Sequence, residues 1–278
     1  MTSQTAWNRP YKLLPYFALV FAWSWLMWFF SAFAKSHGLL AVSSLLLVVG
    51  TFGPSLGAVA IVLSTAGSNG VRHWLRNCIS TRFAWRYLVI ALVFPVVVMA
   101  LAASVHRWMG GTNDRSPAVG HVWLALLNVF LIALIGGPLG EEFGWRGYAL
   151  PILSQKADWR LASLALGVIW GLWHVPLFFM NGTVQSIIPF WLFFASTISM
   201  SVLFAWLSNR TGGSVLPSIV LHTSLNAGTM VVPLLALKPD PHLRAYGIAV
   251  GLLTLTAIAL LSFFPRAHPR PHAARNPT

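Results

Sequence analysis

Long apolar runs constrain this chain more than any other feature of its sequence. Several of them reach or exceed the ~18 to 20 residues that a helix needs to cross the hydrocarbon core of a bilayer. Inside a bilayer the backbone must satisfy its own hydrogen bonds, so that only helices and closed barrels are stable there. The alternating ten-residue segments from which barrels are built do not occur in this sequence. The sequence therefore predicts an all-α, polytopic membrane helix bundle.

Composition excludes other classes of protein. The 278 residues are 57% hydrophobic and 8% charged, with a mean hydropathy of +0.72, whereas a soluble domain has about 25% charged residues. The net charge of +13 does not indicate a nucleic-acid partner, because the basic residues lie mostly between and outside the apolar runs. The single cysteine, Cys78, cannot form an internal disulfide.

We expect about eight transmembrane helices, in one integral-membrane domain over residues 1–264. Residues 265–278 are basic and rich in proline, and we expect them to form a disordered tail. The expected spans lie near residues 13–33, 40–63, 87–105, 122–150, 161–180, 187–207, 216–237 and 246–264.

The distribution of lysine and arginine predicts how the chain is oriented. With the N-terminus in the cytoplasm, thirteen of these residues fall on the cytoplasmic side and five on the other, namely Lys35, Arg107, Arg115, Lys238 and Arg244. Positively charged loops stay on the cytoplasmic side of membranes. We therefore expect both termini in the cytoplasm and a multi-pass protein of the plasma membrane.

Two of the five acidic residues stand side by side in an apolar span. A charged side chain at the centre of a membrane helix costs ~2.5 to 3.5 kcal/mol, so a pair of them usually has partners and a function. Glu142 and Arg146 are separated by four positions, which places them on one helical face as an ion pair. Glu141 points about 100° away and is left free for another role.

Two later spans carry further polar residues. His174 follows Trp170 by one helical turn, and on its own it is equally consistent with a packing histidine and a catalytic one. His222 and Asn226 share one helical face, where side chains of this kind also join helices by hydrogen bonds. With the orientation above, these residues and Glu141 all fall in the cytoplasmic half of the membrane, so we expect them to share one polar cavity.

These side chains are sufficient for amide hydrolysis. A carboxylate that is shielded from water becomes a stronger base and can activate a water molecule. Imidazole and carboxamide groups can stabilise the oxyanion of a tetrahedral intermediate. A serine nucleophile fits less well, because the sequence has no GxSxG motif.

Three motifs in this order resemble the CPBP (ABI) family of intramembrane proteases, which includes the eukaryotic prenyl-protein (CAAX) endoprotease. The motifs are EExxxR at Glu141 to Arg146, an aromatic residue followed by xxxH at Trp170 to His174, and HxxxN at His222 to Asn226. The resemblance covers residues 136–233. Trp170 stands where the family commonly has phenylalanine, and it still places an aromatic ring on one side of the His174 imidazole.

The resemblance implies an endopeptidase that hydrolyses a peptide bond near the membrane surface. Glu141 would activate water with help from His174, while His222 and Asn226 would form the oxyanion site. Glu142, Arg146 and Trp170 would be supporting residues. The implied partners are a peptide or protein substrate at the membrane and the lipid bilayer.

The residue types leave open whether a metal takes part. Two histidines and one carboxylate are a common zinc set, but the HExxH motif is absent, and the same groups can act without a metal. If a metal is present, its ligands would be Glu141, His174 and His222.

Two other functions compete with a protease. One is a catalytically silent membrane protein for bacteriocin immunity or scaffolding, which the full polar set disfavours. The other is a transporter with Glu141 and His174 as a proton relay, which the lack of an internal repeat disfavours.

Overall fold

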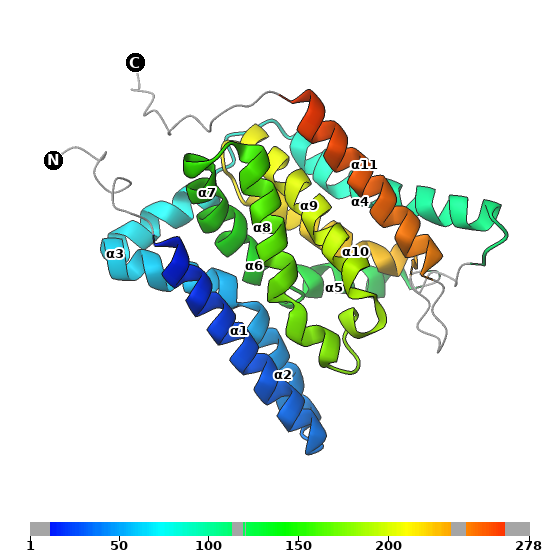
Figure 1. Ribbon diagram of the computed structural model, residues 1–278, viewed down its shortest axis with the longest axis horizontal. Helices are drawn as coiled ribbons and strands as arrows, with labels where there is room; N and C mark the ends of the chain where they lie inside the picture. The colour runs from blue at the N-terminus through cyan, green and yellow to red at the C-terminus, as the bar shows by residue number, and fades with distance from the viewer. Residues whose placement is uncertain (1–11, 113–118, 120, 235–242, 265–278) are drawn as a thin grey trace.

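A computed structural model describes residues 12–112, 119, 121–234 and 243–264 (Figure 1). Every regular element in these residues is helical, which confirms the predicted all-α class. The expected disordered tail, 265–278, lies outside the described residues.

The first half of the chain contributes five helices: α1 (Leu13–Ser36), α2 (Leu40–Thr51), α3 (Gly53–Cys78), α4 (Arg86–Trp108) and α5 (Val122–Ile135). The second half contributes α6 (Pro138–Gly144), the π-helical turn η2 (Trp145–Ala149), α7 (Leu150–Lys156), α8 (Trp159–Trp173), the short 3-10 helices η3 (Val175–Phe179) and η4 (Gln185–Ile187), α9 (Phe190–Arg210), α10 (Leu216–Val231) and α11 (Arg244–Phe263).

Local sequence explains where several helices begin. A proline stands in the first turn of four of them, where its missing N–H breaks no helical hydrogen bond; these residues are Pro54, Pro138, Pro151 and Pro217. The carboxylate of Asp158 caps α8, since it accepts hydrogen bonds from the backbone N–H groups of Arg160 (2.7 Å) and Leu161 (3.2 Å).

Six helical segments of the described chain are long and apolar enough to cross a membrane, or seven if α2 and α3 form one span with a bend of 51°. The chain is therefore a multi-pass membrane protein. The expected span at 216–237 corresponds to α10, whose 16 residues reach only about 24 Å, so the count of eight stays a prediction. Large apolar side chains on α1, α4 and α5 are exposed on the surface, as lipid-facing residues are.

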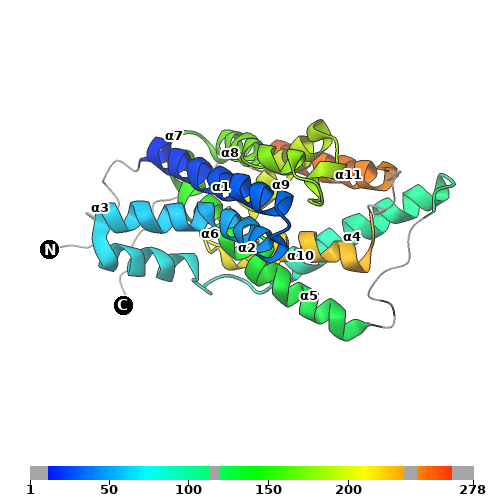
Figure 2. The same cartoon turned by 90° about the horizontal axis from the view of Figure 1, so that it is seen from below.

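The helices pack in two groups around a central pair. α8 lies against α9 in the middle of the molecule, α1 runs beside α2 and α3, and α4 lies against α10 and α11 (Figures 1 and 2). The short α6 contacts α3, α5 and α10, and η2 contacts α3 and α9, so both link the two groups.

The helix ends gather at two opposite ends of the bundle. At one, which we call the basic end, Val215 donates its backbone N–H to the Cys78 carbonyl (2.7 Å), and Arg160 reaches the Phe264 carbonyl (2.5 Å). At the other, which we call the opposite end, Lys35 donates from Nζ to the Asn181 carbonyl (2.5 Å). α1 runs from the basic end to the opposite end (Figure 1).

Candidate active site

A break between α5 and α6 places the paired glutamates. Gly137 has a φ of 113°, a conformation that favours glycine, and Pro138 starts the next helix immediately after it. A β-carbon on Gly137 would stand 2.7 Å from Oε1 of Glu141, closer than real contacts allow. Glycine at this position therefore both makes the turn and leaves space for the Glu141 carboxylate.

Close packing of α6 against α2 and α3 fixes where the Glu141 and Glu142 carboxylates lie along the bundle. Gly140 and Gly144 face the junction of α2 and α3, where added β-carbons would meet backbone atoms of Thr51 at 2.6 Å and of Pro54 at 2.3 Å. Small residues four positions apart let two helices approach this closely inside a membrane.

Glu142 is the centre of a buried ionic cluster. Its Oε1 atom accepts hydrogen bonds from Nη1 of Arg146 (2.9 Å) and from Nδ1 of His222 (2.7 Å). The Arg146 guanidinium lies between the rings of Phe204 (3.9 Å) and Trp170 (4.5 Å). The predicted Glu142–Arg146 ion pair is thus present, and it includes His222, which comes from a different helix.

Glu141 has different partners. Its Oε2 atom accepts a hydrogen bond of 2.6 Å from the indole Nε1 of Trp170, and it makes no ion pair with a described residue. Its other oxygen, Oε1, and Nε2 of His222 both lie within 4 Å of the point where a Gly137 β-carbon would stand. The free oxygen of Glu141 and the free nitrogen of His222 therefore face the same space.

The remaining predicted residues complete that space. His174 donates from Nδ1 to the Trp170 carbonyl (2.8 Å), which leaves its Nε2 as the free ring nitrogen. Asn226 donates one of its two amide hydrogens to the Gly136 carbonyl (3.1 Å), so the second is available to another acceptor.

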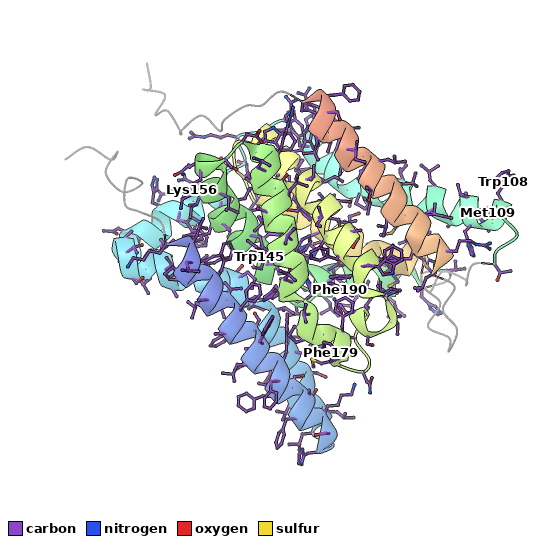
Figure 3. All side chains as sticks on the ribbon, in the orientation of Figure 1. Trp108, Met109, Trp145, Lys156, Phe179 and Phe190 are labelled. Atoms are coloured by element: carbon purple, nitrogen blue, oxygen red, sulfur yellow. The ribbon has the colours of Figure 1, made fainter. Side chains whose placement is uncertain are left out.

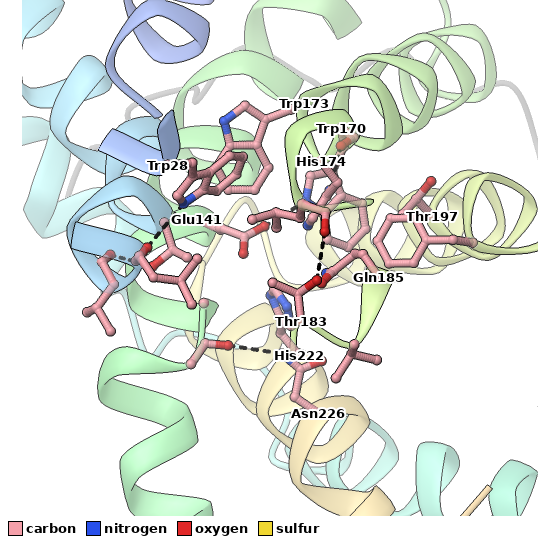
Figure 4. A pocket seen from close by; sticks show the side chains of 18 of the residues that line it. Trp28, Glu141, Trp170, Trp173, His174, Thr183, Gln185, Thr197, His222 and Asn226 are labelled. Carbon is pink, nitrogen blue, oxygen red and sulfur yellow. Dashed lines mark hydrogen bonds between the residues drawn. The ribbon is translucent and has the colours of Figure 1, made fainter. Parts of the chain in front are cut away.

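One pocket of about 370 Å³ collects these groups. Glu141, Trp170, His174, His222 and Asn226 all line it, as Figure 4 shows. The structure therefore brings together the four side chains that the sequence singles out as catalytic, from three different segments, whereas Glu142 and Arg146 do not line the pocket.

The residues do not form a metal site in this arrangement. Within the described part of the chain, no three His, Cys, Asp or Glu side chains are placed to hold one ion. The set expected if a metal takes part, Glu141, His174 and His222, is thus not assembled.

Comparison with known proteins identifies the family. Residues 121–228 match the model of the type II CAAX prenyl endopeptidase Rce1-like family. The chain is also 24% identical, over 264 residues, to a protein of Methanococcus maripaludis named CAAX prenyl protease 2, an alignment that covers 91% of this chain and 95% of that protein. Both comparisons support the CAAX-protease family for this chain, and with it the activity of a membrane protease, an intramembrane endopeptidase of CAAX-protease type.

Some parts of the pocket of this CAAX-type protease were not singled out in the sequence. Trp28 and Trp173 form an aromatic wall beside Glu141 (Figure 4), and Thr183, in the loop between η3 and η4, lines the pocket together with Gln185, the first residue of η4. Fourteen tryptophans occur in an apolar chain, so tryptophan alone gives no signal. The loop has no motif, and only the folded chain shows that it reaches the site.

Proposed function

We propose that Glu141 is the general base that activates water for peptide hydrolysis. The observation that carries this proposal is the different pairing of two neighbouring carboxylates. Glu142 is neutralised by Arg146 and His222, whereas Glu141 keeps one oxygen on the pocket side without an ion-pair partner among the described residues. A base must be free to accept a proton, and only Glu141 meets that condition.

His174 would assist Glu141. Its Nδ1 carries the ring hydrogen, because a carbonyl oxygen can only accept. The Nε2 atom of a neutral ring is then a hydrogen-bond acceptor, which can orient a water molecule toward the scissile carbonyl. The Phe193 and Trp173 rings pack against the imidazole at centroid distances of 5.0 and 4.7 Å and hold its plane.

His222 and Asn226 would stabilise the oxyanion. The second amide hydrogen of Asn226 is free to donate, and Nε2 of His222 can donate as well when the ring carries both protons. Both residues lie on α10, one helical turn apart, so they present their groups to the same side.

These side chains and one water molecule account for every proton transfer in the proposed reaction. The water oxygen attacks the carbonyl carbon while Glu141 takes one proton, and the carbonyl oxygen becomes an oxyanion held by His222 and Asn226. When the tetrahedral intermediate collapses, the C–N bond breaks and Glu141 returns the proton to the leaving amine.

The proposed partners are a peptide or protein substrate at the membrane and the bilayer itself, and the proposed location is the plasma membrane. The relative from Methanococcus maripaludis carries CAAX prenyl protease in its name. In this chain the aromatic wall of Trp28 and Trp173 suits a substrate with an apolar group near the scissile bond.

Replacement of Glu141 tests the proposal. Glu141→Gln keeps the shape and the hydrogen bond from Trp170 but removes the base, so we expect turnover to fall by about 10²- to 10⁴-fold. The measurement compares C-terminal peptides of the membrane proteome in cells with the wild-type chain and with the variant. Asn209→Ala, at the exposed end of α9, is the matched control. Equal processing by Glu141→Gln and wild type would refute the proposal.

A further inference from the structure

The second half of α3 lies across the basic end of the bundle. The helix is interrupted at Gly67, whose φ of 67° and ψ of −173° are not helical, and glycine is the residue that adopts such a φ without strain. After this break the chain turns and runs across the basic end instead of along the bundle (Figures 1 and 2). Residues 68–86, from the break to the first residue of α4, therefore form a segment at the boundary of the membrane.

One face of this segment is fixed to the bundle. Trp74 and Cys78 are four positions apart and 2% and 3% exposed, so they share the inner face of the helix. The Trp74 indole donates its N–H to the Gly147 carbonyl of η2 (2.9 Å), and the Cys78 carbonyl accepts from the backbone N–H of Val215 (2.7 Å). The segment is thus bonded to the helical turn that contains Arg146.

The other face is positively charged. Arg72 and Arg76, which are also four positions apart, are exposed, and so are Arg82 and Arg86 further along the segment. We call these four residues the arginine surface. None of them has an ion-pair partner in the described part of the chain, and residues 68–86 include no Asp or Glu. Because like charges four positions apart on a helix repel each other, a bound anion would remove a cost that the protein itself leaves in place.

Exposed apolar side chains lie on the same segment. Trp85 is 75% exposed and Ile79 is 50% exposed. Helices that lie in the headgroup region of a membrane combine basic residues with tryptophan and aliphatic side chains, which enter the boundary of the acyl chains. A soluble acidic partner would need the charges but not these apolar groups. The combination therefore favours lipid as the occupant of the arginine surface.

Charge distinguishes the two ends of the bundle. Basic residues that flank membrane helices remain in the cytoplasm, and the cytoplasmic leaflet carries the anionic lipids. Three described lysines and arginines lie at or near the opposite end: Lys35, Arg107 and Arg244. Eight lie at or near the basic end: Lys12, Arg72, Arg76, Arg82, Arg86, Lys156, Arg160 and Arg210. The arginine surface therefore faces the leaflet that contains anionic headgroups.

We infer that the arginine surface is a binding site for an anionic phospholipid, with the lipid phosphate held between Arg72 and Arg76. A guanidinium donates two parallel hydrogen bonds to a phosphate, which the ammonium group of lysine cannot do, and all four cations of the surface are arginines. Arg82 and Arg86 extend the positive surface along the headgroup region. The inference goes beyond the proposed function and does not depend on it.

Native mass spectrometry of the purified full chain tests this inference. Titration with phosphatidylglycerol, and separately with phosphatidylcholine, gives a dissociation constant for the first bound lipid of each kind. The test variant carries Arg72→Gln together with Arg76→Gln. The matched control carries Lys12→Gln together with Lys156→Gln, which removes the same charge from two exposed side chains of the basic end. These lysines stand where α1 begins and where α7 ends (Figure 3), across the basic end from the second half of α3 (Figure 2).

We expect the wild-type chain to bind phosphatidylglycerol more tightly than phosphatidylcholine. The test variant should bind phosphatidylglycerol about 10- to 30-fold more weakly, since each cation near an anionic lipid contributes about a factor of five. The control should stay within about twofold of wild type, because salt screens charges that lie farther away.

Two results overturn the inference. Equal affinity for both lipids would point to a soluble acidic partner, and an equal loss in the two double variants would leave only a general attraction to the basic end. If the test variant does not fold, Arg82→Gln together with Arg86→Gln replaces it, and an unchanged affinity then overturns the inference as well. Lipid binding needs no catalysis, so a chain that binds phosphatidylglycerol as expected but cleaves no peptide would contradict only the proposed function.

Discussion

At the scale of single residues, Trp170 connects the components of the site. Its indole N–H holds one oxygen of Glu141, and its carbonyl holds His174. Its ring packs edge-on against both histidines of the pocket, at centroid distances of 5.8 Å from His174 and 5.7 Å from His222. A phenylalanine could keep the ring contacts and the backbone bond, but it could not donate to Glu141. Trp170 is therefore a residue that positions Glu141. Its hydrogen bond to Glu141 can be removed by a substitution that keeps an aromatic ring in the same place.

We predict that Trp170→Phe lowers kcat more than it raises KM. A hydrogen bond to a charged group contributes about 1.5 to 3 kcal/mol, so kcat should fall by about 10- to 100-fold, while KM should stay within about twofold. Steady-state cleavage of a peptide substrate by the purified protein measures both constants.

Trp145→Phe is the matched control for this substitution. The Trp145 side chain is fully buried, and its Nε1 atom has no hydrogen-bond partner among the described residues. The same loss of ring volume should therefore leave kcat nearly unchanged. A rise in KM alone for Trp170→Phe would show that the residue only shapes the pocket.

At the scale of elements, α6 is a seven-residue helix held in place by its contacts. Helices this short are not stable in isolation, so Gly140 and Gly144 must keep it against α2 and α3. The π-helical turn η2 follows directly and contains Arg146. Such turns are frequent at functional sites because they widen the helix locally. Glu141 and Glu142 thus lie on a short α-helix, and Arg146 lies on the π-helical turn that follows it.

We predict that Gly144→Ala destabilises the protein. The new β-carbon would stand 2.3 Å from the Pro54 carbonyl oxygen, and backbone cannot move as readily as a flexible side chain. Overpacking of this kind costs about 1 to 3 kcal/mol, which should appear as a lower Tm in detergent and as reduced activity. Gly251→Ala in α11 is the control, because a β-carbon there meets nothing within 4 Å. A Tm for Gly144→Ala equal to that of Gly251→Ala would contradict the expected packing.

At the scale of the whole molecule, the sequence predicted the local relations and one shared cavity, but not the individual contacts between distant segments. Helix class and the Glu142–Arg146 pair follow from composition and from spacing within a single turn. The break at Gly137 could not be predicted, because the apolar run continues from α5 toward α6 with only a Gly-Gly-Pro interruption. The bond from His222 to Glu142 spans 80 positions, and no pattern along the chain encodes such a contact.

The charge asymmetry leads to a prediction for the C-terminus that does not involve the pocket. α11 ends at the basic end, where Arg160 binds the Phe264 carbonyl and the Arg210 guanidinium lies 4.7 Å from the Phe264 ring centre. The chain should therefore leave the membrane on the cytoplasmic side. Green fluorescent protein fused after Thr278 should fluoresce, whereas alkaline phosphatase at the same position should be inactive, since it folds only outside the cytoplasm. Both fusions are quantified against their expression levels in cells. An active phosphatase fusion would contradict this prediction and reverse the orientation of the bundle.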